Sequence, residues 1–338
     1  MERPMRERIH WVDVAKGLLI LLVVYGHLDW IAATKCGTEA FNYKGQTNFM
    51  FLPYYMPAFF ILTGLCSNFA QPTISFLKKN FLLLIIPNML IGVFLYRWID
   101  LFLNENLSVH NFMEVDYVHI LLTTGGWFLP ALFISKCMVY GLLRIRNAKY
   151  APLIATIVIM YLGMSLYNRG IVNPWYYQHA FMASPFLLLG YYLKRNIDIL
   201  DSWWIPVMGG AFLIMAYFVD YPYLNANPHI NWRNSLLYLA MSGFGSFTLF
   251  WLSVKISSCR VLECIGRHTL VIYLLHGVFL CKLISIMVSL GVEGSLLVWR
   301  IAIGIALVLV STGCCLLVDM YIDKHLGILK GKFALLGK

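Results

Sequence analysis

The feature that most constrains this chain is the recurrence of long apolar runs. Each is close to the ~20 residues that an α-helix needs to cross a bilayer. Strands of a membrane β-barrel would alternate in hydrophobicity over about ten residues, whereas these runs are continuous. The chain is therefore predicted to be an all-α integral membrane protein of about ten transmembrane helices, forming a single domain over residues 1–338. The predicted spans are Val12–Ala33, Phe49–Phe69, Phe76–Leu103, Gly126–Leu143, Ala151–Leu166, His179–Leu193, Trp203–Phe218, Ser235–Val254, Thr269–Leu290 and Ser295–Tyr321.

Composition supports a lipid environment. Of the 338 residues, 60% are hydrophobic and only 12% are charged, about half the charged share of a soluble domain. One soluble core could not bury that much apolar surface. The formal charge of +10 would suggest a nucleic-acid partner in a polar protein, but here the basic residues lie in short loops between apolar runs. Membrane lipids are thus a predicted partner and nucleic acid is not.

The basic residues also predict which side of the membrane each loop faces, because Lys and Arg collect in cytoplasmic loops. One set of alternate connections holds only Lys35, Lys44, Arg169 and Arg233. The other set is predicted to be cytoplasmic, with both chain ends, in a bacterial cytoplasmic (inner) membrane. It contains Arg3, Arg6, Arg8, Lys78, Lys79, Arg144, Arg146, Lys149, Lys194, Arg195, Lys255, Arg260, Arg267, Lys324, Lys330, Lys332 and Lys338.

The cysteines do not suggest a disulfide framework. Most of the eight lie within predicted helices, and only Cys36 lies in a predicted outer loop. They are expected to act as small apolar packing residues.

The first predicted helix carries a polar stripe. Asp13, Lys16 and His27 interrupt an otherwise apolar segment, although a central charge costs roughly 2.5–3.5 kcal/mol on insertion scales. Lys16 and His27 are eleven residues apart, so at 100° per residue they lie within about 20° of the same face and about 16 Å apart along the axis. Asp13 is one turn before Lys16 on that side.

Two interpretations of this stripe remain open from the residues alone. A long substrate with a charged end in the cytoplasm and a reactive end in the membrane, such as coenzyme A, would fit it, with neutral His27 taking a proton from an attacking hydroxyl. Alternatively, Lys16 snorkels to the cytoplasm, Asp13 pairs with it, and His27 is a structural hydrogen-bonding residue.

Six motifs, in order along the chain, resemble the membrane-bound acyltransferase 3 family, and especially its fucose 4-O-acetylase-like branch. They cover essentially the whole chain. They are Asp13-Val-Ala-Lys16-Gly with Gly26-His27, Met56-Pro57-Ala-Phe59-Phe60-Ile-Leu-Thr63-Gly64, Phe76-Leu-Lys78-Lys79 with Ile86-Pro87, Trp127-Phe128-Leu129, Leu189-Gly190-Tyr191, and Gly266-Arg-His-Thr-Leu-Val-Ile-Tyr273-Leu-Leu-His276.

The resemblance implies transfer of an acetyl group from cytoplasmic acetyl-CoA to a hydroxyl of a cell-surface glycan or its lipid-linked precursor. It implies that His27 is the catalytic histidine and Lys16 its basic partner. Three positions depart from the commoner family pattern. Many relatives have Arg where this chain has Lys16, and Lys cannot grip a phosphate with two parallel hydrogen bonds. Thr63 and Thr269 replace the more common Ser.

Other residues are secondary candidates. His276 is a second candidate catalytic residue, with a structural role as the alternative. Lys78, Lys79, Arg144 and Arg146 are candidate contacts for the coenzyme A phosphates, although the positive-inside rule already explains them. The roles of Lys136 and Lys282 stay open. An outer set suits either a sugar site or an interfacial aromatic belt: Trp175, Tyr176, Tyr177, His179, Asp220, Tyr221, Tyr223, Trp232 and Arg233.

Two functions from different classes are therefore weighed. The favoured one is an O-acetyltransferase in which His27 acts as general base or transiently accepts the acetyl group. The alternative is a proton-coupled transporter or lipid-linked glycan flippase, which would use the stripe as a pathway and would need no acetyl-CoA. The sequence predicts no metal site and no permanently bound cofactor. It does not specify the acceptor, the acyl chain or the oligomeric state.

Overall fold

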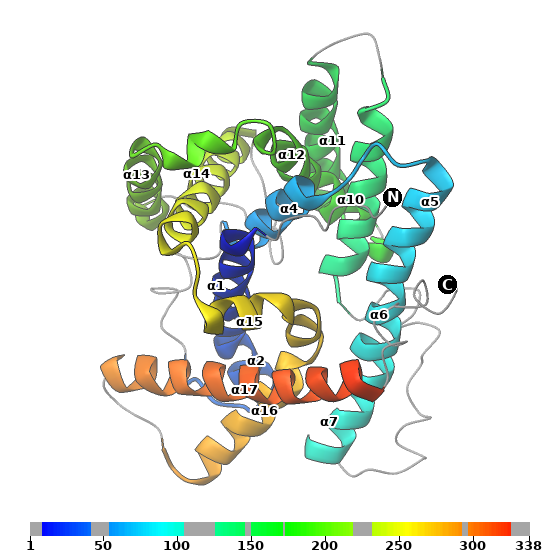
Figure 1. The fold of residues 1–338 in the computed structure, drawn as a ribbon. Helices are drawn as coiled ribbons and strands as arrows, with labels where there is room; N and C mark the ends of the chain where they lie inside the picture. The colour runs from blue at the N-terminus through cyan, green and yellow to red at the C-terminus, as the bar shows by residue number, and fades with distance from the viewer. Residues whose placement is uncertain are drawn as a thin grey trace.

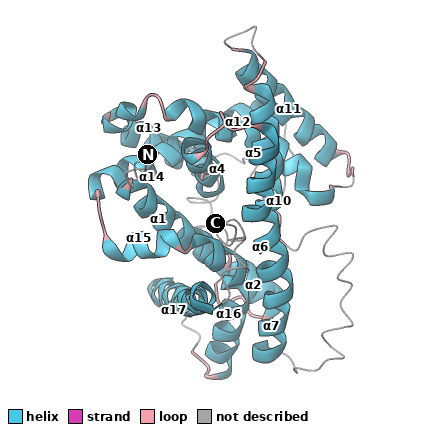
Figure 2. Ribbon diagram, turned by 45° about the vertical axis from the view of Figure 1, so that its right-hand side comes forward, coloured by secondary structure: helices cyan, strands magenta, loops and turns pink. Residues whose placement is uncertain are grey.

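The computed structural model describes residues 9–41, 54–104, 126–145, 150–171, 173–218, 232–292 and 297–325. Throughout these residues the chain is helical, without strands (Figure 2). The helices are α1 (His10–Gly26), α2 (Leu28–Lys35), α4 (Tyr55–Cys66), α5 (Thr73–Asn80), η1 (Phe81–Ile85), α6 (Ile86–Met89), η2 (Leu90–Leu95), α7 (Tyr96–Asn104), α10 (Phe128–Leu142), α11 (Ala151–Asn168), η3 (Pro174–Tyr176), α12 (Tyr177–Leu193), η4 (Ile197–Asp201), α13 (Trp204–Phe218), α14 (Trp232–Ile256), α15 (Arg260–Arg267), α16 (Thr269–Ser289) and α17 (Leu297–His325).

The all-helical prediction is confirmed for these residues. Every predicted span overlaps a helix, although the start of Phe49–Phe69 lies outside the described residues. Six helices are long and apolar enough to cross a membrane: His10–Lys35, Thr73–Asn104, Ala151–Asn168, Leu237–Ile256, Thr269–Ser289 and Val298–His325. The total of ten spans and the cytoplasmic position of both ends stay predictions.

Helix α1 occupies the middle of the molecule (Figure 1). It packs against α4, α14, α15, α16 and α17, which explains why Val14, Leu19 and Val23 are fully buried. A long column runs from α5 to α7, and α10 lies against its η1 segment. Residues from α1, the column, α4, α10 and α16 line the cavity described below.

The column was predicted as one span, Phe76–Leu103. It runs from Thr73 to Asn104 but contains two π-helical segments, η1 and η2, on either side of α6. Pro87 lies in α6. Proline has no N–H for the helical ladder and its ring crowds the preceding turn, so a local change of hydrogen-bond register is expected beside it.

Reciprocal glycine contacts bring two helix pairs unusually close. A Cβ on Gly64 of α4 would lie 2.0 Å from the Leu187 carbonyl oxygen of α12, and a Cβ on Gly190 would lie 1.9 Å from that of Ile61. Small residues let membrane helices approach in this way.

The second pair joins α1 to α15. A Cβ on Gly17 would lie 2.2 Å from the Leu262 carbonyl oxygen, and one on Gly266 would lie 1.9 Å from that of Asp13. Helix α15 was not predicted: this segment was expected to be a basic connection, and the structure shows an eight-residue helix there. Its packing sets Lys16 of α1 close to the start of α16.

Candidate active site

A cavity of about 440 Å³ lies where α1, α4, α5, α10 and α16 meet. This volume is within the range usual for small-molecule sites, ~300–1,000 Å³. Its walls are contributed by the segments that carry five of the six sequence motifs, including Lys16, Thr63, Lys79, Leu129 and Tyr273.

Three lysines line the cavity: Lys16 from α1, Lys79 from α5 and Lys136 from α10. Among its described lining residues there is no Asp or Glu. Outside the lining, the Asp13 carboxylate lies beside one of the three lysines, with its Oδ1 3.6 Å from Lys16 Nζ. Three ammonium groups facing one space favour a ligand with negative charge.

The lining is graded from polar to apolar. Beyond the lysines, the end of α4 and the turn that follows contribute Ser67, Asn68 and Gln71 to the wall. Further along α4 and α10 the wall is made by side chains such as Phe59 and Phe128. A ligand with a charged, hydrogen-bonding end and a less polar end would match this gradient.

The predicted phosphate contacts divide between the cavity and its surroundings. Lys78 and Lys79 are both exposed, but only Lys79 lines the cavity. Arg144 stands beside the rim: its Nη2 donates to the Gln71 carbonyl at 3.0 Å, and its guanidinium lies 3.5 Å from the Tyr140 ring centroid. Arg146 lies outside the described residues. Lys282 is not a lining residue.

His27 lies at a local break within the first candidate membrane span, His10–Lys35, which was predicted as Val12–Ala33. Its Nδ1 lies 2.7 Å from the Val23 carbonyl oxygen, the acceptor that its own backbone N–H would use in a regular α-helix. That N–H donates to Val24 instead, at 3.3 Å. The side chain has displaced the backbone from its normal partner, and α1 ends while α2 begins.

This contact also determines the tautomer of His27. A carbonyl oxygen only accepts, so Nδ1 must carry the proton. In the neutral ring Nε2 is then left with its lone pair, which is the form that a general base requires.

His276 faces His27 from α16. The two ring centroids are 4.9 Å apart, with the ring planes at 66°. His276 Nδ1 lies 2.8 Å from the Tyr273 carbonyl oxygen and 3.0 Å from that of Ile272, so in its neutral form Nε2 is again the unprotonated nitrogen. The structure brings the two predicted histidines together.

Neither imidazole of the histidine pair lines the cavity. Tyr273 connects the cavity to this pair. It lines the cavity, and its ring centroid is 6.3 Å from that of His276. The backbone N–H of Phe128 donates to the Tyr273 hydroxyl at 3.3 Å. Tyr273 and Phe128 are therefore joined in the wall of the cavity, and Tyr273 also lies beside His276.

Comparison with known sequences identifies the family of the chain. The profile of the acyltransferase 3 family, described as an acyltransferase domain, matches residues 9–319. The chain belongs to the acyltransferase 3 family. Searches of curated proteins and of solved structures gave no significant match. With its apolar helices, family membership makes the chain a membrane acyltransferase, as the six motifs predicted. The fucose 4-O-acetylase-like branch stays a prediction.

One lining residue of the cavity, Lys136, and one buried polar residue outside its lining, Asn88, had no role predicted from the sequence. Lys136 was noted without a role, and it meets Lys16 and Lys79 only in the folded chain. Asn88, on α6, is 1% exposed, and its side-chain amide has no hydrogen-bond partner among the described residues. The available sequence signal for Asn88 was a polar residue directly after Pro87 in an apolar run. The only signal for Lys136 was its position well inside a predicted membrane helix.

The predicted outer aromatic set is described in part. Within the described residues, the His179 ring is surrounded by those of Trp127, Tyr167 and Tyr176, with centroids 5.4, 5.7 and 5.4 Å away. Trp127 contacts Phe128 of the cavity wall, at 5.9 Å between centroids. Of the remaining predicted members, Asp220, Tyr221 and Tyr223 lie outside the described residues.

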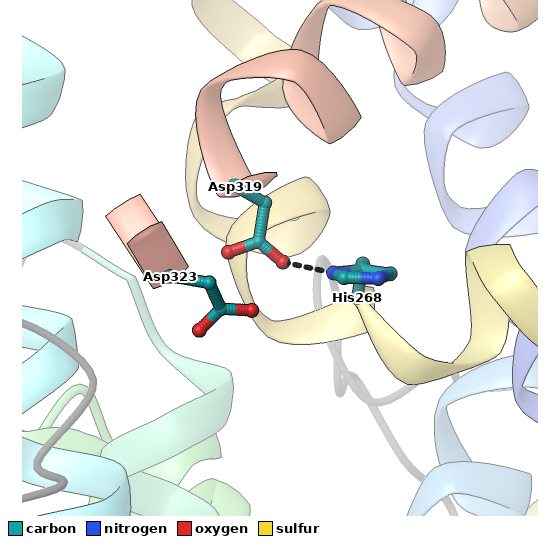
Figure 3. Close-up of side chains that lie close together, drawn as sticks. All are labelled: His268, Asp319 and Asp323. Atoms are coloured by element: carbon teal, nitrogen blue, oxygen red, sulfur yellow. Dashed lines mark hydrogen bonds and ion pairs between the residues drawn. The ribbon is translucent and has the colours of Figure 1, made fainter. Parts of the chain in front are cut away.

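One side-chain cluster has the donor set of a cation site (Figure 3). His268, the N-cap of α16, offers Nδ1, and Asp319 and Asp323 of α17 offer one carboxylate oxygen each, all within 4.8 Å of one another. His268 Nδ1 and Asp319 Oδ2 are 2.5 Å apart. This direct contact between His268 and Asp319 links α16 to α17 and needs no ion. The prediction that the chain has no metal site stays a prediction.

Proposed function

We propose that this membrane acyltransferase moves an acetyl group from acetyl-CoA to a hydroxyl of a glycan or lipid-linked saccharide. The observation that carries the proposal is the sequence of sites along one path: a lysine-lined cavity, then Tyr273, then the facing imidazoles of His27 and His276.

The donor side is supported by charge and shape. Coenzyme A carries phosphates at one end and a thioester at the other. Lys16, Lys79 and Lys136 would pair with the phosphates, and the less polar walls beyond them would accept the chain that leads to the thioester. The acetyl group would then need to pass the wall formed by Tyr273 and Phe128 to reach the imidazoles.

The chemical step uses the free Nε2 of His27. As a general base, His27 would take the proton of the acceptor hydroxyl while the hydroxyl oxygen attacks the thioester carbonyl. Coenzyme A would then leave as the thiol. In the covalent variant, Nε2 would itself attack the thioester and then pass the acetyl group to the hydroxyl. His276, whose ring centroid is 4.9 Å from that of His27, would stabilise the charge that develops on His27 or shuttle the proton.

The acceptor side is supported by the aromatic rings around His179. Sugars stack on aromatic faces, and Trp127 connects this cluster to Phe128 at the cavity wall. A saccharide held there would approach from the side opposite to the lysines. Family membership supports an enzyme, and no observation on the described residues favours the transporter or flippase.

The test is transfer of label from acetyl-labelled acetyl-CoA. Membranes containing the protein should incorporate acetyl groups into glycan or lipid-linked saccharide, and membranes without it should not. Label that stays on acetyl-CoA with every saccharide fraction offered, together with no binding of acetyl-CoA by the purified protein, would overturn the proposal.

Neighbouring lysines give a matched test of the donor site. We expect Lys79→Gln to weaken binding of acetyl-CoA by about tenfold, since a hydrogen bond to a charged group contributes about 1.5–3 kcal/mol. Lys136→Gln should act similarly. Lys78→Gln, one residue from Lys79 but outside the cavity, should change affinity less than twofold. Calorimetric titration of the purified variants measures this, and equal losses for Lys78→Gln and Lys79→Gln would remove the cavity as the phosphate site.

A further inference from the structure

Two cysteines far apart in the sequence meet beside the histidine pair. Cys36 caps the C-terminal end of α2 and Cys281 lies on α16. Their sulfur atoms are 3.8 Å apart. The Cys36 thiol also lies 3.5 Å from the Cys281 carbonyl oxygen, and the Ser285 hydroxyl lies 3.7 Å from Cys36 Sγ. Both cysteines are half-buried, so a small reagent can approach them.

We infer that Cys36 and Cys281 are a disulfide-forming pair that links α2 to α16. A disulfide needs its sulfurs at about 2.05 Å, so the two atoms must approach by about 1.8 Å from their present separation. Rotation of the side chains about Cα–Cβ moves a sulfur by that much without moving a helix. The partners are separated by 245 positions, so the fold itself brings them together.

The position of the pair gives the bond a structural consequence. His27 immediately precedes α2, which ends at Cys36, and His276 lies five residues before Cys281 on α16. A covalent link between these cysteines would hold the two helices together on the side of the histidine contact away from the lysine-lined cavity. It would also restrict the unfolded chain, because it closes a very long loop.

The oxidation is a thiol–disulfide exchange. One cysteine thiolate attacks a disulfide of the surroundings, forming a mixed disulfide and releasing one thiol. The second thiolate then attacks the sulfur of the first cysteine, and the second thiol leaves. The pair loses two electrons and two protons, and the acceptor disulfide gains them. The basic loops predict that Cys36 faces the outer side of the membrane, where disulfides form and persist.

Thiol counting on the full-length purified protein tests the inference independently of any acyl transfer. The protein is incubated with reduced or oxidised glutathione, unfolded, and labelled with a maleimide polymer that shifts the gel band for each free thiol. The chain has eight cysteines, and we expect eight labels after reduction and two fewer after oxidation. Peptide mapping of the oxidised protein should recover the Cys36 peptide joined to the Cys281 peptide.

The control variants change one cysteine each. Cys36→Ser and Cys281→Ser should each give the same number of labels in both conditions, and Cys66→Ser should still lose two on oxidation. Undiminished labelling of the oxidised wild type would overturn the inference, as would loss of two labels in Cys36→Ser. The peptide map needs no variant, so a linkage found between other cysteines would overturn it even if a variant failed to fold.

Discussion

We expect His27→Gln to lower the rate of acetyl transfer by about 10³-fold, since a positioned general base contributes roughly 10²–10⁴-fold. Gln keeps a side chain that can donate to the Val23 carbonyl, which Nδ1 now contacts at 2.7 Å, but it has no basic lone pair. Affinity for acetyl-CoA should stay within twofold, because His27 does not line the lysine-lined cavity. The rate of label transfer from acetyl-CoA at matched protein levels measures the effect.

The matched control is His10→Gln, the same change on the same helix. His10 lies at the start of α1, and its Nδ1 is 3.1 Å from a Glu263 oxygen rather than near the cavity. It should keep wild-type activity. Full activity in His27→Gln would rule out both proton abstraction and acyl transfer at that ring. Loss of activity in His276→Gln alone would assign the chemistry to His276.

A second measurement on the same variants separates the two mechanisms. If His27 accepts the acetyl group, the wild type should release free coenzyme A from acetyl-CoA in the absence of acceptor and retain label on the protein. His27→Gln should do neither. If the hydroxyl attacks directly, release should require the acceptor even in the wild type.

The sequence predicted the helical class and the family because both depend on local signals. Continuous apolar runs indicate membrane helices wherever they occur, and the motifs are short strings. The placement of Lys16 and His27 on one side of α1 follows from the 3.6-residue repeat of a regular helix and stays a prediction. The break at His27 was not predicted, because it depends on one imidazole taking the Val23 carbonyl from the backbone.

Which residues line the candidate site was harder to predict from the sequence, for a physical reason. Lys78 and Lys79 are equivalent in a pattern of basic residues. Successive helical residues differ by a rotation of about 100°, and only Lys79 lies on the cavity wall. Lys136 joins it from α10, and Cys281 meets Cys36 from α16. Contacts between helices depend on packing distance and rotation, which no single segment encodes.

Two glycines of the sequence motifs, Gly64 and Gly190, lie where α4 and α12 pack closely. We expect Gly190→Ala to destabilise the folded protein by at least about 3 kcal/mol, at the upper end of overpacking effects. The added Cβ would lie 1.9 Å from the Ile61 carbonyl oxygen. That atom belongs to helix backbone and cannot rotate away, so α12 and α4 must separate. Gly64→Ala should act in the same way, since its Cβ would lie 2.0 Å from the Leu187 carbonyl oxygen.

The same Gly→Ala substitution at an uncrowded position should raise the free energy of unfolding instead of lowering it. Gly210 lies within α13, and a Cβ there would meet nothing within 4 Å. Gly210→Ala should therefore stabilise the helix by about 0.5–1 kcal/mol, because glycine loses more backbone freedom on folding than alanine does. Thermal unfolding of the purified proteins in detergent compares the variants. Gly64→Ala and Gly190→Ala combined should cost less than the sum of the two, since either change alone already separates α4 from α12. A melting temperature for Gly190→Ala equal to that of Gly210→Ala would mean that α4 and α12 do not approach through these glycines.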